Sequence, residues 1–157
     1  MTAKELMKQC EAEEKELKFR EFSSATALAI GMALIEEAKK RDNKICIDIA
    51  IAGRRLFHYS SDGNAVSNDI MIERKKKTAM HTGHSSLWAH YMLEDCGMNI
   101  KEKWALEPYA QVGGAFPIRL ENCQTVIGTI TCSGFNHEQD HSIIIDVCRK
   151  LKRESVL

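Results

Sequence analysis

The spacing of apolar and polar residues predicts two helices at the start of the chain. Residues 2–19 are rich in Glu, Lys and Leu, which favour a helix with one solvated face. Ser23 and Ser24 can cap a second helix, because a serine hydroxyl accepts hydrogen bonds from the free N–H groups of a first turn. Apolar residues then recur at helical spacing over residues 25–38, and the cations at 39–41 suit a helix C-terminus.

A change of period predicts a β-hairpin. Over residues 44–52, isoleucine occupies every second position from Ile45 to Ile51, which is typical of a strand with one buried face. Gly53 provides the turn, and residues 55–60 return as the second strand.

The pattern over residues 68–152 predicts a mixture of helices and strands. We expect a helical stretch at 68–91 with a break near 82–83, after which Ser85 can cap the second segment. We also expect a short helix at 95–105, strands near 109–112, 115–120 and 125–132, and a last helix at 137–152. Tight hairpins favour antiparallel pairing, because parallel pairs need long crossovers. The sequence therefore predicts an α/β sandwich with a five-stranded, mainly antiparallel sheet flanked by helices.

Length and charge narrow the class of protein. A chain of 157 residues predicts one domain, with residues 1–20 as a helical extension. Lys and Arg number 22, as do Asp and Glu, so the net charge is zero. This balance argues against a nucleic-acid or membrane-surface binder, which normally carries a basic excess. A neutral chain also tends to self-associate.

The cysteine pattern predicts a reducing compartment. Six cysteines are present, none of them in a C-x-x-C motif. An even number would permit disulfides, yet Cys46, Cys132 and Cys148 lie in apolar strand or helix patterns where free cysteine acts as a small hydrophobic residue. The first 18 residues are charged and lack the apolar core of a signal peptide. We therefore expect a cytoplasmic protein.

The most informative stretch is the end of the strand at 126–134 and the helix that follows. Glycines there allow a ligand to approach the backbone closely, and a helix N-terminus attracts a carboxylate or phosphate. We expect a ligand site around this junction, formed by His84, Ser133, Asn136, His137 and His141. The alternative is that these polar groups only cap the helix.

His137 and His141 also suggest a metal site. Histidines four residues apart lie on one helix face and can bind one ion, with a third ligand from elsewhere in the fold. The structural alternative is that His137 flanks the helix N-terminus and His141 is partly exposed.

Two further motifs have an ordinary structural explanation. Residues 73–77, Glu-Arg-Lys-Lys-Lys, could bind phosphate, but most such runs are solvated helix faces, and the neutral whole-chain charge favours that interpretation. Cys132 could be a reactive thiolate if a helix N-terminus lowered its pKa, although a lone cysteine in a strand more often packs in the core.

Several separated motifs resemble the heme-degrading-domain (HbpS-like, GlcG-like) family, most closely an uncharacterised branch of about this length found in bacteria and fungi. They are Gly-Gly-Ala-Phe-Pro-Ile at 113–118, the strand at 126–134, Arg74-Lys75, Gly83-His84-Ser85-Ser86 and the hairpin at 53–59. The resemblance implies a profilin-like sandwich and a tight homo-oligomer. It also implies heme as one ligand, because relatives in the family bind heme.

Three functions remain open from the sequence. The first is an oligomer larger than a dimer that binds a small anionic ligand, such as heme, or a metal ion. The second is an enzyme that acts on a small anionic substrate at the turn of residues 133–137, for which a histidine or cysteine of perturbed pKa should face a pocket. The third is a structural oligomer without a ligand.

Overall fold

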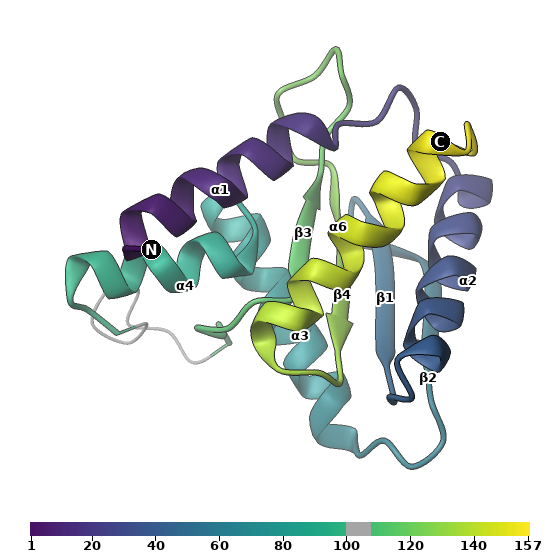
Figure 1. Cartoon of the computed structure of the whole chain (residues 1–157), viewed down its shortest axis with the longest axis horizontal. Helices are drawn as coiled ribbons and strands as arrows, with labels where there is room; N and C mark the ends of the chain where they lie inside the picture. The colour runs from purple at the N-terminus through teal and green to yellow at the C-terminus, as the bar shows by residue number, and fades with distance from the viewer. Residues whose placement is uncertain (100–107) are drawn as a thin grey trace.

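Residues 1–99 and 108–157, which the computed structural model describes, form helices on both faces of an antiparallel sheet (Figure 1). The elements in chain order are α1 (Ala3–Glu16), α2 (Ser24–Lys40), β1 (Cys46–Ile51), β2 (Arg54–Ser60), α3 (Val66–Thr82), α4 (Ser86–Cys96), β3 (Ala115–Ile118), β4 (Gly128–Ser133) and α6 (His137–Arg153). The helices and the hairpin expected in the first ninety residues, and the last helix, are confirmed.

The sheet has the strand order β2-β1-β4-β3, and every neighbouring pair is antiparallel. The hairpin between β1 and β2 turns through Ala52 and Gly53, whose φ angles are 50° and 77°. Positive φ at both central residues matches the right-handed twist of the strands, as in a type I′ turn. β1 and β4 are the two central strands, and nearly all of their residues are buried.

The two faces of the sheet are covered by different helices. In Figure 1, α6 and α2 lie on one face and α3 lies on the other. Ile45, Ile47 and Ile49 point to the α2–α6 side, where they join the main apolar cluster. The alternate residues of β1, Cys46 and Asp48, therefore point to the α3 side.

Helix α1 packs against α4 at one end of the molecule, away from the sheet (Figure 1). This contact has its own small apolar cluster of Cys10, Leu87 and Tyr91. After α1 the chain returns to the sheet, where Phe19 forms an isolated parallel bridge with Leu120.

The predicted start and stop signals act as expected. The Ser23 hydroxyl accepts a hydrogen bond from the Thr26 N–H at the start of α2, and the Ser85 hydroxyl accepts one from Trp88 N–H at the start of α4. Gly83, with a φ of 72°, ends α3 in the left-handed conformation. The predicted break near residues 82–83 is therefore a true helix boundary.

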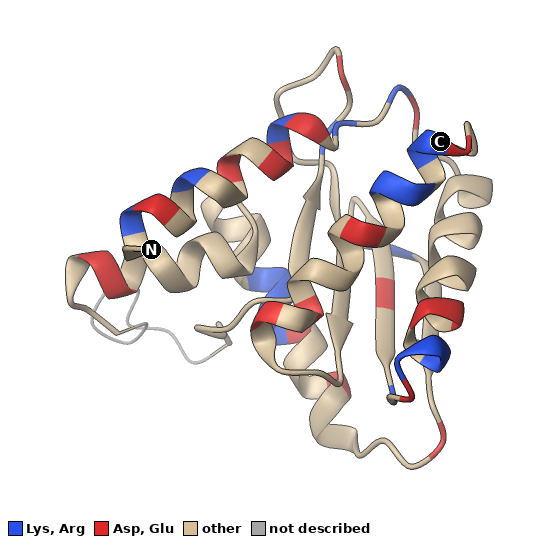
Figure 2. Cartoon of the chain, in the orientation of Figure 1, with Lys and Arg blue, Asp and Glu red and all other residues tan. Residues whose placement is uncertain are grey.

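Most charged residues of the described chain are exposed or partly exposed, and the buried ones are Glu14, Asp48, Lys75 and Asp140. In Figure 2, acidic (red) and basic (blue) residues are interspersed along the ribbon of α1. In the described part of the chain, no helix combines the length and the apolar character that crossing a bilayer requires.

The strand predicted at 109–112 is not formed, and the sheet has four strands among the described residues. Backbone groups of this segment bind side chains instead of a neighbouring strand. The Thr78 hydroxyl lies 3.0 Å from both the N and the O of Ala110, and Arg74 Nε donates to Tyr109 O. Of the short helix predicted at 95–105, residues 95–96 belong to the end of α4, and residues 100–107 lie outside the described residues.

The interpretation of residues 73–77 as a solvated face is wrong for Lys75. Its side chain is buried, and its ammonium group lies 2.8 Å from Asp140 Oδ2 and donates to Cys132 O at 2.9 Å. This part of α3 faces the sheet, so Lys75 must find its partners inside the protein, and Lys76 likewise pairs with the buried Asp48.

Candidate functional site

The predicted strand–turn–helix junction is formed, and its polar groups cap the helix. Ser133 is the buried last residue of β4, and Asn136 precedes the first turn of α6. The Asn136 side chain accepts a hydrogen bond from Gln139 N–H at 2.9 Å. An open hollow of about 510 Å³ lies over this turn, lined by Arg41, Asn43, Gly134, Phe135, Asn136 and Gln139.

Cys132 is not an activated thiol at this junction. Its side chain is fully buried, and burial raises its pKa well above the ordinary value, with the charge of Asp140 adding to the effect. The hypothesis that the helix N-terminus stabilises a Cys132 thiolate is therefore wrong, because a nucleophilic cysteine needs a lowered pKa and the pKa of Cys132 is raised.

His137 does not line that hollow and instead binds the segment before β3. Its Nδ1 accepts a hydrogen bond from Gly113 N–H at 3.2 Å, and its ring lies edge-on to His90 with 4.6 Å between the centroids. Burial lowers the pKa of His137, and the neighbouring His90 lowers it further. His137 is therefore a neutral hydrogen-bond acceptor near neutral pH.

His141 lies one turn further along α6 and contacts α1. It is buried, and its Nε2 lies 2.7 Å from Glu13 Oε2. A cavity of about 330 Å³ beside it is lined by Leu6, Gln9, Cys10, Glu13, Leu87, Tyr91, Glu138, Gln139, His141 and Ser142. We call this the α1–α6 cavity. The metal site predicted at His137 and His141 stays a prediction, since these two imidazoles have different neighbours here.

His84 lies at the start of α4, again against α1. Its Nδ1 lies 2.8 Å from Glu14 Oε2, and its ring stacks on Trp88 with 4.0 Å between the centroids. Glu14 is buried, and its other oxygen accepts Ser85 N–H at 2.6 Å. A buried carboxylate thus fixes both the orientation and the protonated nitrogen of this imidazole.

A cavity of about 380 Å³ opens beside this imidazole. It is lined by Glu11, Glu14, Lys15, Lys18, His84, Arg119 and Gln124. We call it the His84 cavity. Arg119 donates to Gly83 O and to Gln124 O and lies 3.7 Å from Glu14 Oε2, so it is held by three partners at the cavity wall. Three cations and one oriented imidazole therefore surround a space that solvent can enter.

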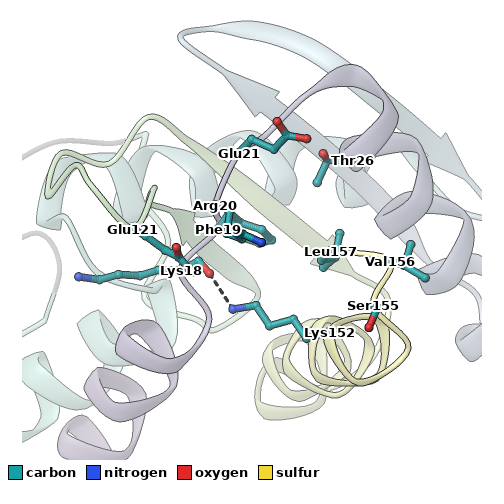
Figure 3. Close-up of a pocket in the computed structure, with 10 residues that line it drawn as sticks. All are labelled: Lys18, Phe19, Arg20, Glu21, Thr26, Glu121, Lys152, Ser155, Val156 and Leu157. Carbon is teal, nitrogen blue, oxygen red and sulfur yellow. Dashed lines mark hydrogen bonds between the residues drawn. The ribbon is translucent and has the colours of Figure 1, made fainter.

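The largest of these four cavities, of about 820 Å³, lies where the segment between α1 and α2 meets the C-terminal residues (Figure 3). Lys18, Arg20 and Lys152 contribute cations, and Glu21 and Glu121 contribute carboxylates. Lys152 Nζ donates to Lys18 O at 2.7 Å, the dashed line in Figure 3, and lies 5.9 Å from the Phe19 ring centre. No histidine, cysteine, methionine or tyrosine is among the described residues that line it.

The predicted residues are therefore divided among three places. Ser133 and Asn136 lie together at the turn, while His137 contacts His90. His84 and His141 each bind one of two adjacent glutamates of α1, Glu14 and Glu13. The sequence reasoning missed both glutamates, since the only local signal is a pair of acidic residues within a charged helix.

The chain matches a protein-family model and several bacterial relatives. The family model with the description "Haem degrading protein HbpS-like" matches residues 22–148. A UPF0303 protein of Streptomyces coelicolor is 33% identical over 142 residues, which cover 89% of each chain.

Solved structures agree with this match. The crystal structure of the Ybr137w protein is 30% identical, with a TM-score of 0.88 over 95% of this chain and 89% of that one. The crystal structure of a PduOC:Heme complex is 18% identical, with a TM-score of 0.64 over 78% of this chain and 89% of that one. The second likeness shows the shared fold alone.

Proposed function

This chain belongs to the haem degrading protein HbpS-like family, and we propose that it is a binding protein for a small anionic ligand of the heme class. A related fold has been solved as a heme complex, which supports this choice of ligand class. The observation that carries the proposal is His84, an imidazole held by the buried Glu14 at the wall of a cavity rich in cations.

Among the four cavities described above, the His84 cavity alone combines, in its described lining, the two kinds of group that heme needs, an iron-ligating side chain and cations. The largest one has cations but no side chain among its described lining residues that commonly ligates iron. The α1–α6 cavity offers His141, Cys10 and Tyr91, but it is smaller, and no lysine or arginine is among the described residues that line it, so its glutamates lack a cation to offset their repulsion of the propionates. In the His84 cavity an imidazole stands beside Lys15, Lys18 and Arg119.

Each residue of the His84 cavity has a definite part in this proposal. Glu14 binds Nδ1, so Nε2 is the nitrogen available to ligate iron, and the carboxylate increases its basicity. Arg119, Lys15 and Lys18 pair with the carboxylates of the ligand. Trp88 stacks on one face of the ring and limits its rotation. Heme, when bound, supplies an iron centre for ligand exchange or electron transfer.

The experiment is a titration of the purified protein with hemin, followed by the Soret absorption band. We expect saturable binding with a shifted Soret band in the natural protein. His84→Gln should weaken binding at least about tenfold, which corresponds to about 1.4 kcal/mol. His81→Gln, a change in an exposed histidine at the end of α3, is the matched control and should leave binding unchanged.

The outcome separates the ligand classes. If His84→Gln keeps both the affinity and the Soret position, His84 is not the ligand and the proposal fails. If Arg119→Gln weakens binding of both hemin and iron-free porphyrin while His84→Gln weakens neither, the cavity binds an anionic ligand without iron ligation. Circular dichroism of each variant verifies that the fold is intact.

We further propose that the chain forms a homo-oligomer larger than a dimer and is located in the reducing cytoplasm. Its fold would be a profilin-like sandwich with residues 1–20 as a helical extension. Large apolar side chains are exposed on two helices: Leu28 and Met32 on α2, and Val66 and Ile70 on α3. Surfaces of this kind often mark protein–protein contacts. The six free cysteines suit a reducing compartment. Light scattering that returned a monomer at micromolar concentration would contradict the oligomer.

A further inference from the structure

A thiol, an imidazole and a carboxylate meet on the α3 side of the hairpin, and none of the three residues lines the His84 cavity. The register pairs Asp48 with His58 and Cys46 with Ser60. Cys46 and His58 are thus diagonal neighbours on one face of the sheet. Asp69, in the first turn of α3, lies over them, so three separate elements contribute to the cluster.

The spacing of these groups matches that of ligands around one small cation. Asp69 Oδ1 lies 3.4 Å from Cys46 Sγ and 3.5 Å from His58 Nε2, and the three ligand atoms lie within 4.8 Å of one another. With Zn–S bonds of about 2.3 Å and Zn–N and Zn–O bonds of about 2.1 Å, tetrahedral geometry separates the ligand atoms by about 3.4–3.6 Å. Little movement is needed to admit the ion.

A buried carboxylate stands behind the imidazole. Asp48 is fully buried, and its Oδ2 lies 3.5 Å from His58 Nδ1. Arg55 and Lys76 hold Asp48, with nitrogen–oxygen distances of 2.6 and 2.9 Å. Ligating histidines usually direct their second nitrogen to such a group, which fixes the tautomer and raises the basicity of the ligating nitrogen.

The other cluster of this kind fits a metal less well. Cys10, Glu13 and His141 also bring their ligand atoms within 4.8 Å. There, however, His141 Nε2 and Glu13 Oε2 are only 2.7 Å apart, a hydrogen-bond distance. His141 Nδ1 is buried and has no hydrogen-bond partner among the described residues, so it lacks a supporting carboxylate.

We propose that Cys46, His58 and Asp69 bind one divalent cation of the zinc class, with water as the fourth ligand. One thiolate, one imidazole and one carboxylate form a borderline donor set that suits Zn²⁺ better than Mg²⁺ or Ca²⁺. His58 is about one-third exposed, at 32%, so water can reach the open position. Binding converts the Cys46 thiol and the free ion into a metal thiolate and releases one proton.

The metal-free cysteine is not a thiolate on its own. Burial, with Asp69 adding to it, raises the pKa of Cys46 to about 12. The incoming cation must therefore displace the thiol proton, and it offsets the negative charges of the sulfur and of Asp69.

Cobalt titration of the reduced, metal-free protein tests this site. Co²⁺ substitutes for Zn²⁺, and a thiolate ligand in a tetrahedral site gives a charge-transfer band together with intense visible bands. We expect one Co²⁺ per chain, displaced by Zn²⁺. Cys46→Ser should abolish the charge-transfer band, and His58→Gln and Asp69→Asn should each weaken binding at least about tenfold.

Cys10→Ser is the matched control, because Cys10 is also buried and belongs to the competing cluster. It should leave the band and the affinity unchanged. If the band is lost in Cys10→Ser and kept in Cys46→Ser, the metal lies in the wrong cluster for this proposal. Unchanged binding in both His58→Gln and Asp69→Asn, whose side chains are partly exposed and whose folding is verified by circular dichroism, also overturns it. Heme binding through His84 should be the same with or without Zn²⁺.

Discussion

Lys75 of α3 and Asp140 of α6 form a buried ion pair, with 2.8 Å between Nζ and Oδ2. Asp140 Oδ1 also accepts Phe135 N–H at 2.8 Å, and the Lys75 ammonium group also donates to Cys132 O. The pair thereby fixes the end of β4, the turn that follows and the first turn of α6. It supports the junction in which the sequence analysis placed a ligand.

Loss of Lys75 should destabilise the fold severely. Lys75→Met leaves the Asp140 carboxylate buried without its cation, which typically costs about 3–5 kcal/mol. Lys77→Met, at an exposed position of the same helix, should change the free energy of unfolding by no more than about 0.5 kcal/mol. Urea unfolding followed by circular dichroism measures both. Equal stability of the two variants would show that the ion pair does not hold the junction.

Gly114 should tolerate no side chain. Its φ is 128°, and a Cβ atom there would lie 2.5 Å from Cys132 O and 2.7 Å from Lys75 Nζ. Gly114→Ala should therefore unfold the protein or cost several times as much as Gly53→Ala. Gly53 also has a positive φ, but it faces open space, so only the backbone term of about 1–2 kcal/mol applies. Thermal unfolding of the two variants compares them, and similar melting temperatures would refute the steric argument.

His137 should make stability fall on mild acidification. Burial, and then His90, lower its pKa below the 6.5 of a free imidazole. As the pH falls below about 6.5, the unfolded chain binds a proton at this residue before the folded chain does, so the free energy of unfolding decreases. His137→Asn keeps an acceptor near Gly113 N–H and should show a shallower decrease between about pH 7.5 and about pH 5.5. A decrease as steep as in the natural protein would assign the effect to other groups.

Thiol reactivity should follow burial. Burial is the main cause that raises the pKa of Cys10, Cys46 and Cys148 to about 12, whereas Cys96 is exposed and Cys123 is partly exposed. Labelling of the native protein with a thiol reagent should modify Cys96 first, then Cys123, and the other four only slowly. Denatured protein, prepared without reductant, should show all six thiols free. Fewer than six would reveal a disulfide, and rapid labelling of Cys10 would contradict its burial.

Elements defined by local signals could be predicted from the sequence. Ser23, Ser85 and Gly83 act within one helical turn of their own position, so their roles could be predicted without a fold. The hairpin was equally clear, because the period of two and the glycine turn are local features.

Features that depend on distant partners could not be predicted. Residues 109–112 have a strand-like pattern, but the Thr78 hydroxyl, 32 residues away, binds both backbone groups of Ala110. Lys75 looked like its solvated neighbours because nothing nearby in the sequence indicates Asp140, 65 positions later. Glu13 and Glu14 bind histidines 128 and 70 residues away.

The position of α1 has a consequence for the comparison of relatives. The matched family segment starts at residue 22, after α1, yet α1 supplies the carboxylates that orient His84 and His141. It packs mainly on α4, through an apolar cluster separate from the main one. A chimera that carries the first helix of a homologue would therefore exchange the partners of both imidazoles and leave the sheet unaltered. Substitutions in α1 can therefore change the hydrogen-bond partners of His84 and His141 without any change in the sheet.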